Sequence, residues 1–380
     1  MLVIFHNSTN LFEFQFDPWL SKQRFFHGYL GREDLPLLLQ NHGDFLVRCN
    51  EARKGQQDEI IVSVLHDPEG TYKDLDNEDK IEATELTLKR AIRLAKWEYS
   101  PQSVEVGKLI TTGSYGEIKQ GKLTRADGKV IDVAIKMMKG RSDTNKQQLK
   151  EMVREARLMR GLDHTSIVRF YGVCLLKQPI YILFELLSGG PLDVYLKEHK
   201  DKINEDEKLQ MAMSVGWGLE YLHSNAILHR DIAAKNCFYD IGKVVKIGEF
   251  ALSREGTTYS MKTARKMSIK WMAPESLRTF IFTQKTDVYS YGVLIYEVFS
   301  CSEPYPKLVA TVAKEAILNG TLNEFPESTP TKLVEYVKEK MWDSSPEKRS
   351  DMQSVVKWMQ SFTGLTLIRH DEKVNCTLIE

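Results

Sequence analysis

Long hydrophobic runs and closely spaced cysteines are missing from this sequence of 380 residues. No stretch approaches the ~18 apolar residues of a membrane-spanning helix, and the first residues lack the basic start and apolar core of a secretory signal. The five cysteines include no CxxC pair, which argues against a zinc site or a disulfide framework. Residue 2 is Leu2 rather than the glycine that N-myristoylation requires. We therefore expect a cytoplasmic protein without a transmembrane segment.

An excess of charge of either sign is also missing. The 52 Lys and Arg balance the 52 Asp and Glu, so the net charge is zero and the chain has no long-range field to concentrate it on nucleic acid. With 42% hydrophobic and 27% charged residues, the composition is that of a globular protein of two or three domains. No repeat or low-complexity tract stands out. Nucleic acid is therefore not an expected partner.

A change of pattern divides the chain near residue 100. Residues 66–85 are rich in Asp and Glu and poor in large apolar side chains, which predicts a solvated connection. Apolar positions begin to alternate at Val104, where we expect a second module to start with short strands. Strands are expected over 130–137 and 180–186, around one helix. The apolar face of that helix comprises Leu149, Met152, Val153, Ala156 and Met159.

The rest of the second module has helical periodicity. Two stripes of apolar residues predict long helices, and Asp287 is the expected N-cap of the second. The first stripe comprises Ala212, Val215, Leu219 and Leu222, and the second comprises Val288, Tyr291, Leu294, Ile295 and Val298. A small sheet lobe is therefore expected to precede a larger helical lobe.

Gly113 and Gly116 lie between two strand patterns, in TTGSYGEIKQG. Glycines let a backbone approach phosphate oxygens and present N–H donors to them. Taken alone, two glycines around Ser-Tyr more often form an ordinary hairpin turn. Other residues of the module must decide between these interpretations.

The strand segment VAIK places Ala134 and Lys136 on one face. The small side chain leaves room for a flat base beside a cationic amine. Glu155 lies at the edge of the apolar face of the following helix, from which it would point toward the sheet. An ion pair of Lys136 with Glu155 would fix the amine on phosphate oxygens, whereas separately each residue fits an exposed position equally well.

The segment LHRDIAAKNC is the most specific string in the chain. Asp231 suits a carboxylate that accepts or orients a hydroxyl proton, and Asn236 suits an oxygen ligand of a hard cation. A charged surface loop is a poor alternative for so many fixed positions.

Together these motifs resemble the catalytic domain of the eukaryotic protein kinases, from Val104 to about Phe362. The resemblance implies a two-lobed α+β fold that binds ATP with Mg²⁺ or Mn²⁺. It assigns catalytic roles to Lys136, Glu155, Arg230, Asp231 and Asn236, and metal binding to Asn236 and Glu249. The expected nucleotide-binding residues are Gly113, Gly116, Ile118, Ala134, Lys136, Glu185 and Leu187. It also implies a buried ion pair between Glu275 of MAPE and Arg349.

Two segments are similar to the tyrosine-specific branch of that family. These are IAAKN after Asp231 and IKWMAPE with Trp271, although Ser268 replaces a proline that is usual in this branch. The resemblance implies transfer of the ATP γ-phosphoryl group to tyrosine of protein substrates. Tyr259 is the expected activation-loop phosphorylation site, whose phosphate could pair with Arg230.

FFHG, REDL and GDFLVR, in that order, resemble the start of a Src-homology-2 domain. The resemblance assigns phosphotyrosine binding to Arg48 with help from Arg32, and makes phosphotyrosine proteins possible partners. The second half of the domain is expected to be truncated within residues 66–86. The segment joining the two modules looks like the joint of the Fes/Fer non-receptor tyrosine kinases, and their N-terminal membrane-curving domain is not expected before Phe25.

We accordingly expect an SH2-like α/β domain over 18–97, a kinase domain over 104–363 and a C-terminal tail over 364–380. A pseudokinase scaffold, which binds phosphotyrosine or nucleotide without efficient catalysis, is the alternative. It is favoured by Thr111 in place of the first loop glycine, Glu249 in place of the metal-binding aspartate and Ala251 in place of a mobile glycine.

Overall fold

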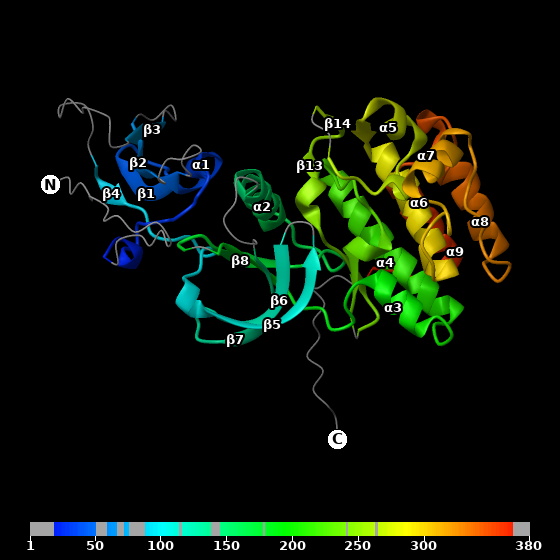
Figure 1. Cartoon of the computed structure of the whole chain (residues 1–380), viewed down its shortest axis with the longest axis horizontal. Helices are drawn as coiled ribbons and strands as arrows, with labels where there is room; N and C mark the ends of the chain where they lie inside the picture. Colours follow the sequence, from blue (N-terminus) through cyan, green and yellow to red (C-terminus); the bar gives the residue numbers. More distant parts are fainter. Residues whose placement is uncertain are drawn as a thin grey trace, which may run out of the picture. The chain divides into compact units, whose positions relative to one another are not determined.

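The structure is a computed structural model, in which the chain divides into two compact units (Figure 1). It describes residues 19–50, 59–66, 72–75, 88–113, 116–137, 145–177, 179–240, 242–262 and 265–367. Unit 1 consists of Met1–Gly161 and Phe170–Leu186, and unit 2 consists of Leu162–Arg169 and Leu187–Glu380.

Unit 1 begins with a small sheet, which we call the first module together with the residues around it (19–97). Its strands have the order β3-β2-β1-β4, with β1 and β2 antiparallel and β4 parallel to β1. The strands are β1 (Asp44–Asn50), β2 (Glu59–Leu65), β3 (Tyr72–Leu75) and β4 (Arg90–Ala91), and α1 spans Leu35–Leu38. The prediction of a solvated connection over 66–85 is thus wrong for residues 72–75, which form strand β3. A strand that completes only a sheet edge needs few apolar side chains.

The second sheet of unit 1 has five antiparallel strands in the order β5-β6-β7-β9-β8. They are β5 (Val104–Gly113), β6 (Gly116–Thr124), β7 (Val130–Met137), β8 (Phe170–Cys174) and β9 (Tyr181–Glu185), with helix α2 (Asn145–Arg160) before β8. The predicted strands over 130–137 and 180–186 are present as β7 and β9. The predicted apolar face of α2 packs into the core through Leu149, Met152 and Ala156.

The first module and helix α2 share one hydrophobic core. Phe26, Leu35 and Leu46 belong to the same cluster of buried residues as Leu149 and Met152. Tyr29 N–H also donates to the carbonyl of Leu175, at 3.1 Å. The two parts therefore fold as one body within unit 1.

A buried carboxylate reinforces this packing. Asp34 is 3% exposed and accepts two hydrogen bonds of 3.0 Å from Arg157 of α2, from Nε and Nη2. Arg160, one helical turn later, also donates to Asp34 at 3.3 Å and covers the ring of Trp97. These charge-assisted hydrogen bonds offset the desolvation cost of burying the Asp34 carboxylate.

Unit 2 is mostly helical. Its helices are α3 (Leu192–His199), α4 (Glu205–Ser224), α5 (Pro274–Thr279), α6 (Gln284–Ser300), α7 (Ala310–Leu318), α8 (Thr331–Tyr336) and α9 (Met352–Thr363). Its short strands are β10 (Ile227–Leu228), β11 (Cys237–Tyr239), β12 (Val245–Ile247), β13 (Arg254–Glu255), β14 (Thr258–Ser260) and β15 (Ile281–Thr283), which form three two-stranded pairs. Within the described residues, no helix of the chain is long and apolar enough to cross a lipid bilayer.

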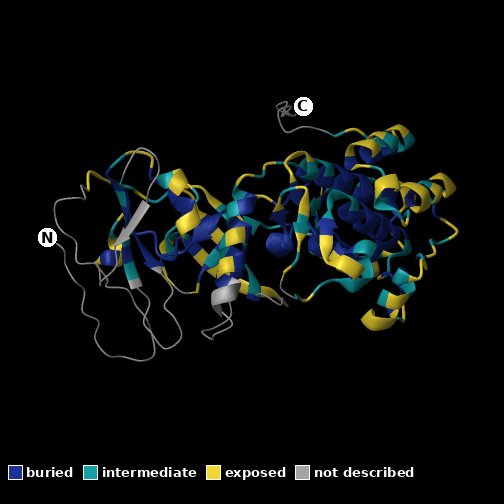
Figure 2. Cartoon of the chain, turned by 90° about the horizontal axis from the view of Figure 1, so that it is seen from above, coloured by how far each residue is buried: buried dark blue, intermediate teal, exposed yellow. Residues whose placement is uncertain are grey.

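The centre of unit 2 is formed by α4 and α6. Their predicted apolar stripes are buried throughout. Figure 2 draws much of the helical part of the chain in the dark blue of buried residues. The predicted N-cap of α6 is wrong by one turn. Thr283 caps the helix with a reciprocal hydrogen bond to Thr286, and Asp287 lies inside the first turn. The carboxylate of Asp287 instead accepts the backbone N–H groups of His229 and Arg230.

The predicted buried ion pair of unit 2 is present. Arg349 has no exposed side-chain surface and donates to both carboxylate oxygens of Glu275, at 2.6 and 2.9 Å. Its Nε also donates to the carbonyl of Asp343 at 2.8 Å. The pair fixes α5, and hence MAPE, to the segment that precedes α9.

Candidate active site

The lysine and glutamate expected to hold nucleotide phosphates form a buried ion pair in unit 1. Lys136 on β7 is 4% exposed and Glu155 on α2 is 3% exposed. The ammonium Nζ donates to both carboxylate oxygens, at 3.0 and 2.9 Å. Two buried charges of opposite sign at this distance hold each other in place. The amine is therefore positioned in the sheet without any ligand.

The glycine loop connects the ends of β5 and β6. Gly113 and Gly116 are paired across the hairpin, and Gly116 has φ 144, a conformation that favours glycine. Ser114 and Tyr115 lie outside the described residues. Thr111 is exposed on β5 and faces Ile118 in the register of the hairpin.

The remaining nucleotide-binding candidates surround this lysine or lie at the junction of the two units. In the register of the sheet, Ile118 pairs with Lys136, and Ala134 pairs with Phe184. Glu185 is the last residue of β9 in unit 1, and Leu187 is the first residue of unit 2 after it. These two nucleotide-binding candidates thus lie on either side of the point where the chain passes from unit 1 to unit 2.

In unit 2 we call residues 229–236, which include Asp231 and Asn236, the catalytic loop. Hydrogen bonds around His229 hold this loop in place. His229 Nε2 lies 2.9 Å from the carbonyl of Gly248, which can only accept, so Nε2 carries the proton. Its Nδ1 then accepts from the N–H of Asp231 at 3.3 Å. The side chain of Asn236 donates from Nδ2 to the backbone carbonyl of Asp231 at 2.7 Å. The backbone carbonyl of Asn236 accepts from Gly248 N–H. Asp231 and Asn236 are thereby brought together, with Glu249 next in the chain to Gly248.

The side chain of Asp287 in α6 binds the backbone of the catalytic loop. This carboxylate is 1% exposed and accepts the backbone N–H groups of His229 at 2.8 Å and Arg230 at 2.9 Å. Arg230 has φ 70, an uncommon conformation for a residue other than glycine. The two hydrogen bonds stabilise that strained conformation, which sets the direction of Asp231.

Glu249 and Ala251 occupy the metal motif. Glu249 is in the left-handed helical region, with φ 56 and ψ 63. Phe250 is 1% exposed and packs edge-on against His229, with ring centroids 5.1 Å apart. Ala251 is buried in the short 3-10 turn Phe250–Leu252 and does not have positive φ. Alanine therefore fits this backbone conformation. Compared with glycine, it disfavours only backbone conformations, such as positive φ, that residue 251 does not adopt here.

Tyr259 on β14 is surrounded by arginines. The guanidinium of Arg230 lies 4.2 Å from the centre of its ring, and that of Arg254 lies at 5.3 Å. Burial would raise the pKa of the Tyr259 hydroxyl, but the hydrogen bond and charge of Arg254, with the charges of Arg230 and Arg265, lower it below its ordinary value. Nε of Arg230 is buried and has no hydrogen-bond partner among the residues that the structure describes. This cluster is a suitable environment for an anion on Tyr259.

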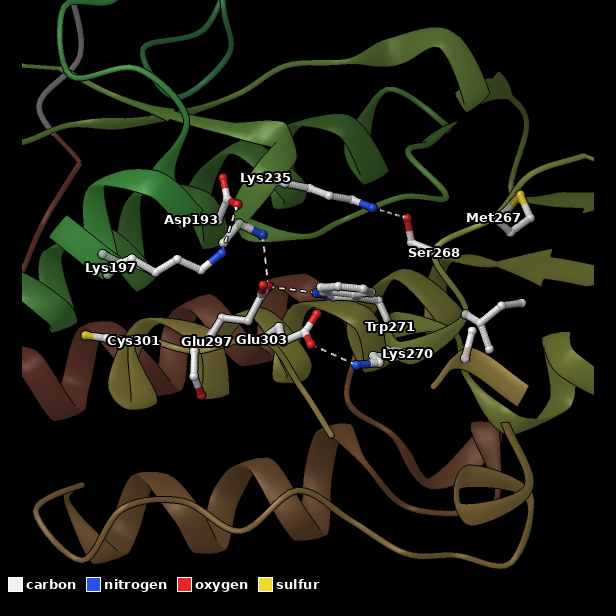
Figure 3. A pocket seen from close by; sticks show the side chains of 15 residues that line it. Asp193, Lys197, Lys235, Met267, Ser268, Lys270, Trp271, Glu297, Cys301 and Glu303 are labelled. Atoms are coloured by element: carbon white, nitrogen blue, oxygen red, sulfur yellow. Dashed lines mark hydrogen bonds and ion pairs between the residues drawn. The ribbon is translucent and has the colours of Figure 1, made fainter. Parts of the chain in front are cut away.

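A pocket of about 370 Å³ adjoins the catalytic loop (Figure 3). It is lined by parts of α3, α6, the loop residues Ala234 and Lys235, and the segment 267–271. Lys235 Nζ donates to the hydroxyl of Ser268 at 2.6 Å and covers the ring of Trp271. Ser268, where the resemblance leads one to expect proline, therefore connects the catalytic loop to the segment before MAPE.

Glu297 of α6 is a residue that the sequence analysis missed. It is 3% exposed, and its Oε2 accepts from Trp271 Nε1 at 2.7 Å and from Ala234 N–H at 2.9 Å, as Figure 3 shows. The available signal was a single carboxylate in the otherwise apolar second half of a buried helix. Burial raises the pKa of Glu297 to about 8, and the two hydrogen bonds oppose this only in part.

The raised pKa of Glu297 predicts a dependence of stability on pH. In the unfolded chain this carboxyl has its ordinary pKa of 4.5, so between about pH 5 and 8 the folded state binds more protons and unfolding becomes easier as the pH rises. We expect wild type to lose stability relative to Glu297→Gln over this range, by at most about 1.4 kcal/mol per pH unit. Thermal denaturation of both proteins from pH 5 to 8.5 measures the difference. Curves that run parallel would contradict it.

The predicted phosphotyrosine-binding arginines also lie together, in unit 1. Arg48 on β1 is 5% exposed, and its Nε donates to Ser63 on β2 at 2.9 Å. Arg48 and Arg32 line the same pocket, of about 560 Å³. Residues 51–58, which follow β1, lie outside the described residues.

Comparison with known proteins agrees with this geometry. Residues 104–359 match the family described as protein tyrosine and serine/threonine kinase. The chain is 31% identical over 369 residues to human tyrosine-protein kinase Fer, covering 89% of this chain and 44% of Fer. It is also 31% identical to the transforming protein Fps of avian sarcoma virus, over 88% of this chain and 67% of that protein. Fer-related kinase 1 of Caenorhabditis elegans is 30% identical, over 89% of this chain and 93% of the relative.

The chain thus spans less than half the length of Fer but nearly all of the nematode relative. The family match begins at Val104, where the sequence pattern predicts the second module to start. It covers the ion pair of Lys136 with Glu155, the catalytic loop and MAPE. The chain therefore belongs to the protein tyrosine and serine/threonine kinase family, as a relative of the Fer and Fps kinases.

Proposed function

We propose that the chain is a cytoplasmic protein tyrosine kinase that transfers the γ-phosphoryl group of ATP to tyrosine of protein substrates. The observation that carries the proposal is the buried ion pair between Lys136 and Glu155. It orients a cation toward phosphate oxygens before any ligand binds, which reduces the cost of reorganisation during transfer. Phosphate transfer to a tyrosine peptide, lost in Asp231→Asn, tests the proposal.

The nucleotide-binding residues have complementary roles. Backbone N–H groups at Gly113 and Gly116 would cover the phosphates, and Lys136 would bind their oxygens. Ile118 and Ala134 would contact the adenine, since they flank this lysine on β6 and β7. Glu185 and Leu187 would receive the edge of the base through their backbone.

The catalytic loop supplies the side chains that would contact the tyrosine hydroxyl and the metal ion. Asp231 would orient the tyrosine hydroxyl and accept its proton, and Arg230 would anchor the loop. Asn236 and Glu249 would hold the metal ion, and their donor atoms fit it, because Nδ2 of Asn236 is committed to Asp231 and leaves the amide oxygen as ligand. Among the described residues no cluster of three His, Cys, Asp or Glu forms a metal site. When bound, the ion neutralises charge on the transferred phosphate.

Tyrosine as the acceptor is supported by the segment before MAPE. Trp271 donates to Glu297, and Lys235 donates to Ser268, so hydrogen bonds connect this segment to α6 and to the catalytic loop beside the pocket of Figure 3. The proteins that this chain resembles are named tyrosine kinases. An SH2-like domain over 18–97, a kinase domain over 104–363 and a tail over 364–380 remain the proposed organisation.

A second candidate function is a pseudokinase scaffold. The observation in its favour is Glu249, which occupies the position of a metal-binding aspartate with a longer side chain and a left-handed backbone. Thr111 and Ala251 are further departures in the same nucleotide site. Such a protein would bind nucleotide or phosphotyrosine without efficient transfer. The hydrogen bonds that hold the backbone of residues 229–231 and the side chain of Asn236 favour the kinase.

Phosphorylation of Tyr259 is the expected regulatory event. A phosphate on this residue would be attracted by Arg230 and Arg254, which already contact the ring, and would order the segment before MAPE. After incubation with ATP, mass spectrometry should find phosphate on Tyr259, and Tyr259→Phe should lower the activity of the incubated enzyme several-fold. A fully active Tyr259→Phe enzyme would remove the regulatory role.

Phosphotyrosine binding is the proposed role of the pocket around Arg48. Because hydrogen bonds to a charged group contribute about 1.5–3 kcal/mol, Arg48→Ala should weaken binding of a phosphotyrosine peptide by about tenfold or more. Calorimetry on the full chain is the appropriate measurement, since the first module shares its core with α2. Equal affinity of wild type and Arg48→Ala would show that the assignment of the pocket is wrong.

A further inference from the structure

The pocket around Arg48 is not formed by the first module alone. Its lining includes five consecutive residues from Tyr29 to Glu33, residues of strands β1 and β2, and five residues of helix α2. The α2 residues are Leu149, Lys150, Val153, Arg154 and Arg157. Its volume of about 560 Å³ lies within the range of roughly 300–1,000 Å³ that is usual for ligand pockets. A helix of the kinase module is therefore a wall of the proposed phosphotyrosine pocket.

The charges that line the pocket are strongly unequal. Five lining residues are cationic, namely Arg32, Arg48, Lys150, Arg154 and Arg157, and one is anionic, Glu33. Glu33 is 72% exposed at its side chain and lies 3.5 Å from Arg157, which also pairs with Asp34. In a chain of zero net charge, such a concentration of cations around one hollow is a site for an anion.

Lys150 and Arg154 are the cations on α2 that packing does not explain. They are four residues apart, so they project from the same side of the helix, where two like charges destabilise it slightly. Both are exposed, and within the described residues neither has an ion-pair partner. Arg157, in contrast, is used to bind Asp34. The two side chains are thus available to a ligand in the pocket.

Lys150 and Arg154 lie on a different side of α2 from Glu155, which pairs with Lys136. Consecutive residues of an α-helix differ by about 100° in direction, and Glu155, next to Arg154, points to Lys136 of the sheet. Leu149 and Val153 supply apolar surface between the two cations on the pocket side. A ligand with a ring and a dianionic head could therefore contact α2 without disturbing the ion pair of Lys136 with Glu155.

We propose that Lys150 and Arg154 of helix α2 are phosphotyrosine-binding residues, so that the binding site is completed by the kinase module. The inference rests on the proposed function of Arg48 and adds the second wall of the same site. The ligand is a peptide with phosphorylated tyrosine, whose phosphate lies between Arg48 and the two cations of α2. Unphosphorylated tyrosine peptides lack the charge that these cations attract.

The test is the affinity of the full chain for a fluorescein-labelled phosphotyrosine peptide, measured by anisotropy. The double variant Lys150→Ala/Arg154→Ala should bind about tenfold more weakly than wild type, and its affinity should fall less steeply with added salt because two of the attracting charges are gone. The matched control is Lys122→Ala/Arg125→Ala, which removes one lysine and one arginine at exposed positions of the same unit. It should change the affinity less than twofold.

The variants also separate the two proposals. If Arg48→Ala loses binding while Lys150→Ala/Arg154→Ala binds as wild type does, the phosphotyrosine function stands and the role of α2 is wrong. If wild type binds the phosphorylated peptide no better than the unphosphorylated one, both proposals fail. If the α2 double variant and the Lys122/Arg125 control weaken binding equally, the effect is one of overall charge and the role of α2 is again wrong. Thermal denaturation should show equal stability for both double variants, since all four side chains are exposed.

Discussion

Asp231→Asn is expected to lower the rate of phosphate transfer by about 10²–10⁴-fold, the usual contribution of a positioned acid–base group. The substitution replaces one carboxylate oxygen by an amide nitrogen of the same size, so the loop should keep its structure. Its backbone is held independently, through the carboxylate of Asp287 and the amide of Asn236. Only the ability to accept the hydroxyl proton is removed.

The rate loss is measured by initial velocities at saturating ATP and peptide. Asp240→Asn is the matched control, because Asp240 is a half-buried residue in the turn after β11, and its carboxylate accepts a hydrogen bond from the hydroxyl of Ser188. It should retain the wild-type rate. A wild-type rate no higher than that of Asp231→Asn would support the scaffold instead.

Glu249→Asp combined with Ala251→Gly should raise the magnesium-dependent rate by at least about tenfold, which equals ~1.4 kcal/mol of transition-state stabilisation. The extra methylene of glutamate displaces its carboxylate by roughly one C–C bond, about 1.5 Å, whereas magnesium requires near-ideal octahedral geometry. Aspartate also tolerates the left-handed conformation of residue 249 better than glutamate does. Wild-type activity should accordingly be low and favour manganese, which also accepts carboxylate oxygen.

The two substitutions are expected to contribute differently. Ala251 has ordinary backbone angles here, so Ala251→Gly should act by allowing the segment to move and Glu249→Asp by improving the metal ligand. The two contributions are separated by measuring the rate of phosphate transfer for each single variant and for the double variant, with magnesium and with manganese. Glu255→Asp, in an exposed carboxylate on β13, is the control and should have no effect. A folded double variant that binds ATP but is silent with both metals would count against the kinase.

The local features of the site follow from the sequence because they depend on periodicity. Alternation over 130–137 places Lys136 on a strand face, and helical spacing places Glu155 on the side of α2 that meets the sheet, so their ion pair can be expected. The segment that holds Asp231 and Asn236 is likewise expected as one functional string, and the Asn236 side chain donates to the backbone carbonyl of Asp231.

Contacts between distant segments do not follow in this way. Asp34 and Arg157 are 123 residues apart, and no local pattern indicates that the first module packs on α2. Asp287 has the residue type of a helix cap, but its carboxylate has better donors in the catalytic loop, which leaves the cap to Thr283. Glu297 was missed for the same reason, since its partners Trp271 and Ala234 come from other elements.

The central claim is that this chain transfers phosphate to tyrosine, and one measurement tests it most directly. Wild type and Asp231→Asn are incubated with γ-labelled ATP, magnesium or manganese, and three peptides that differ only in carrying tyrosine, serine or threonine. We expect label on the tyrosine peptide alone, faster with manganese, and none above background with Asp231→Asn. Equal label with wild type and Asp231→Asn, or label on serine and threonine, would contradict the account.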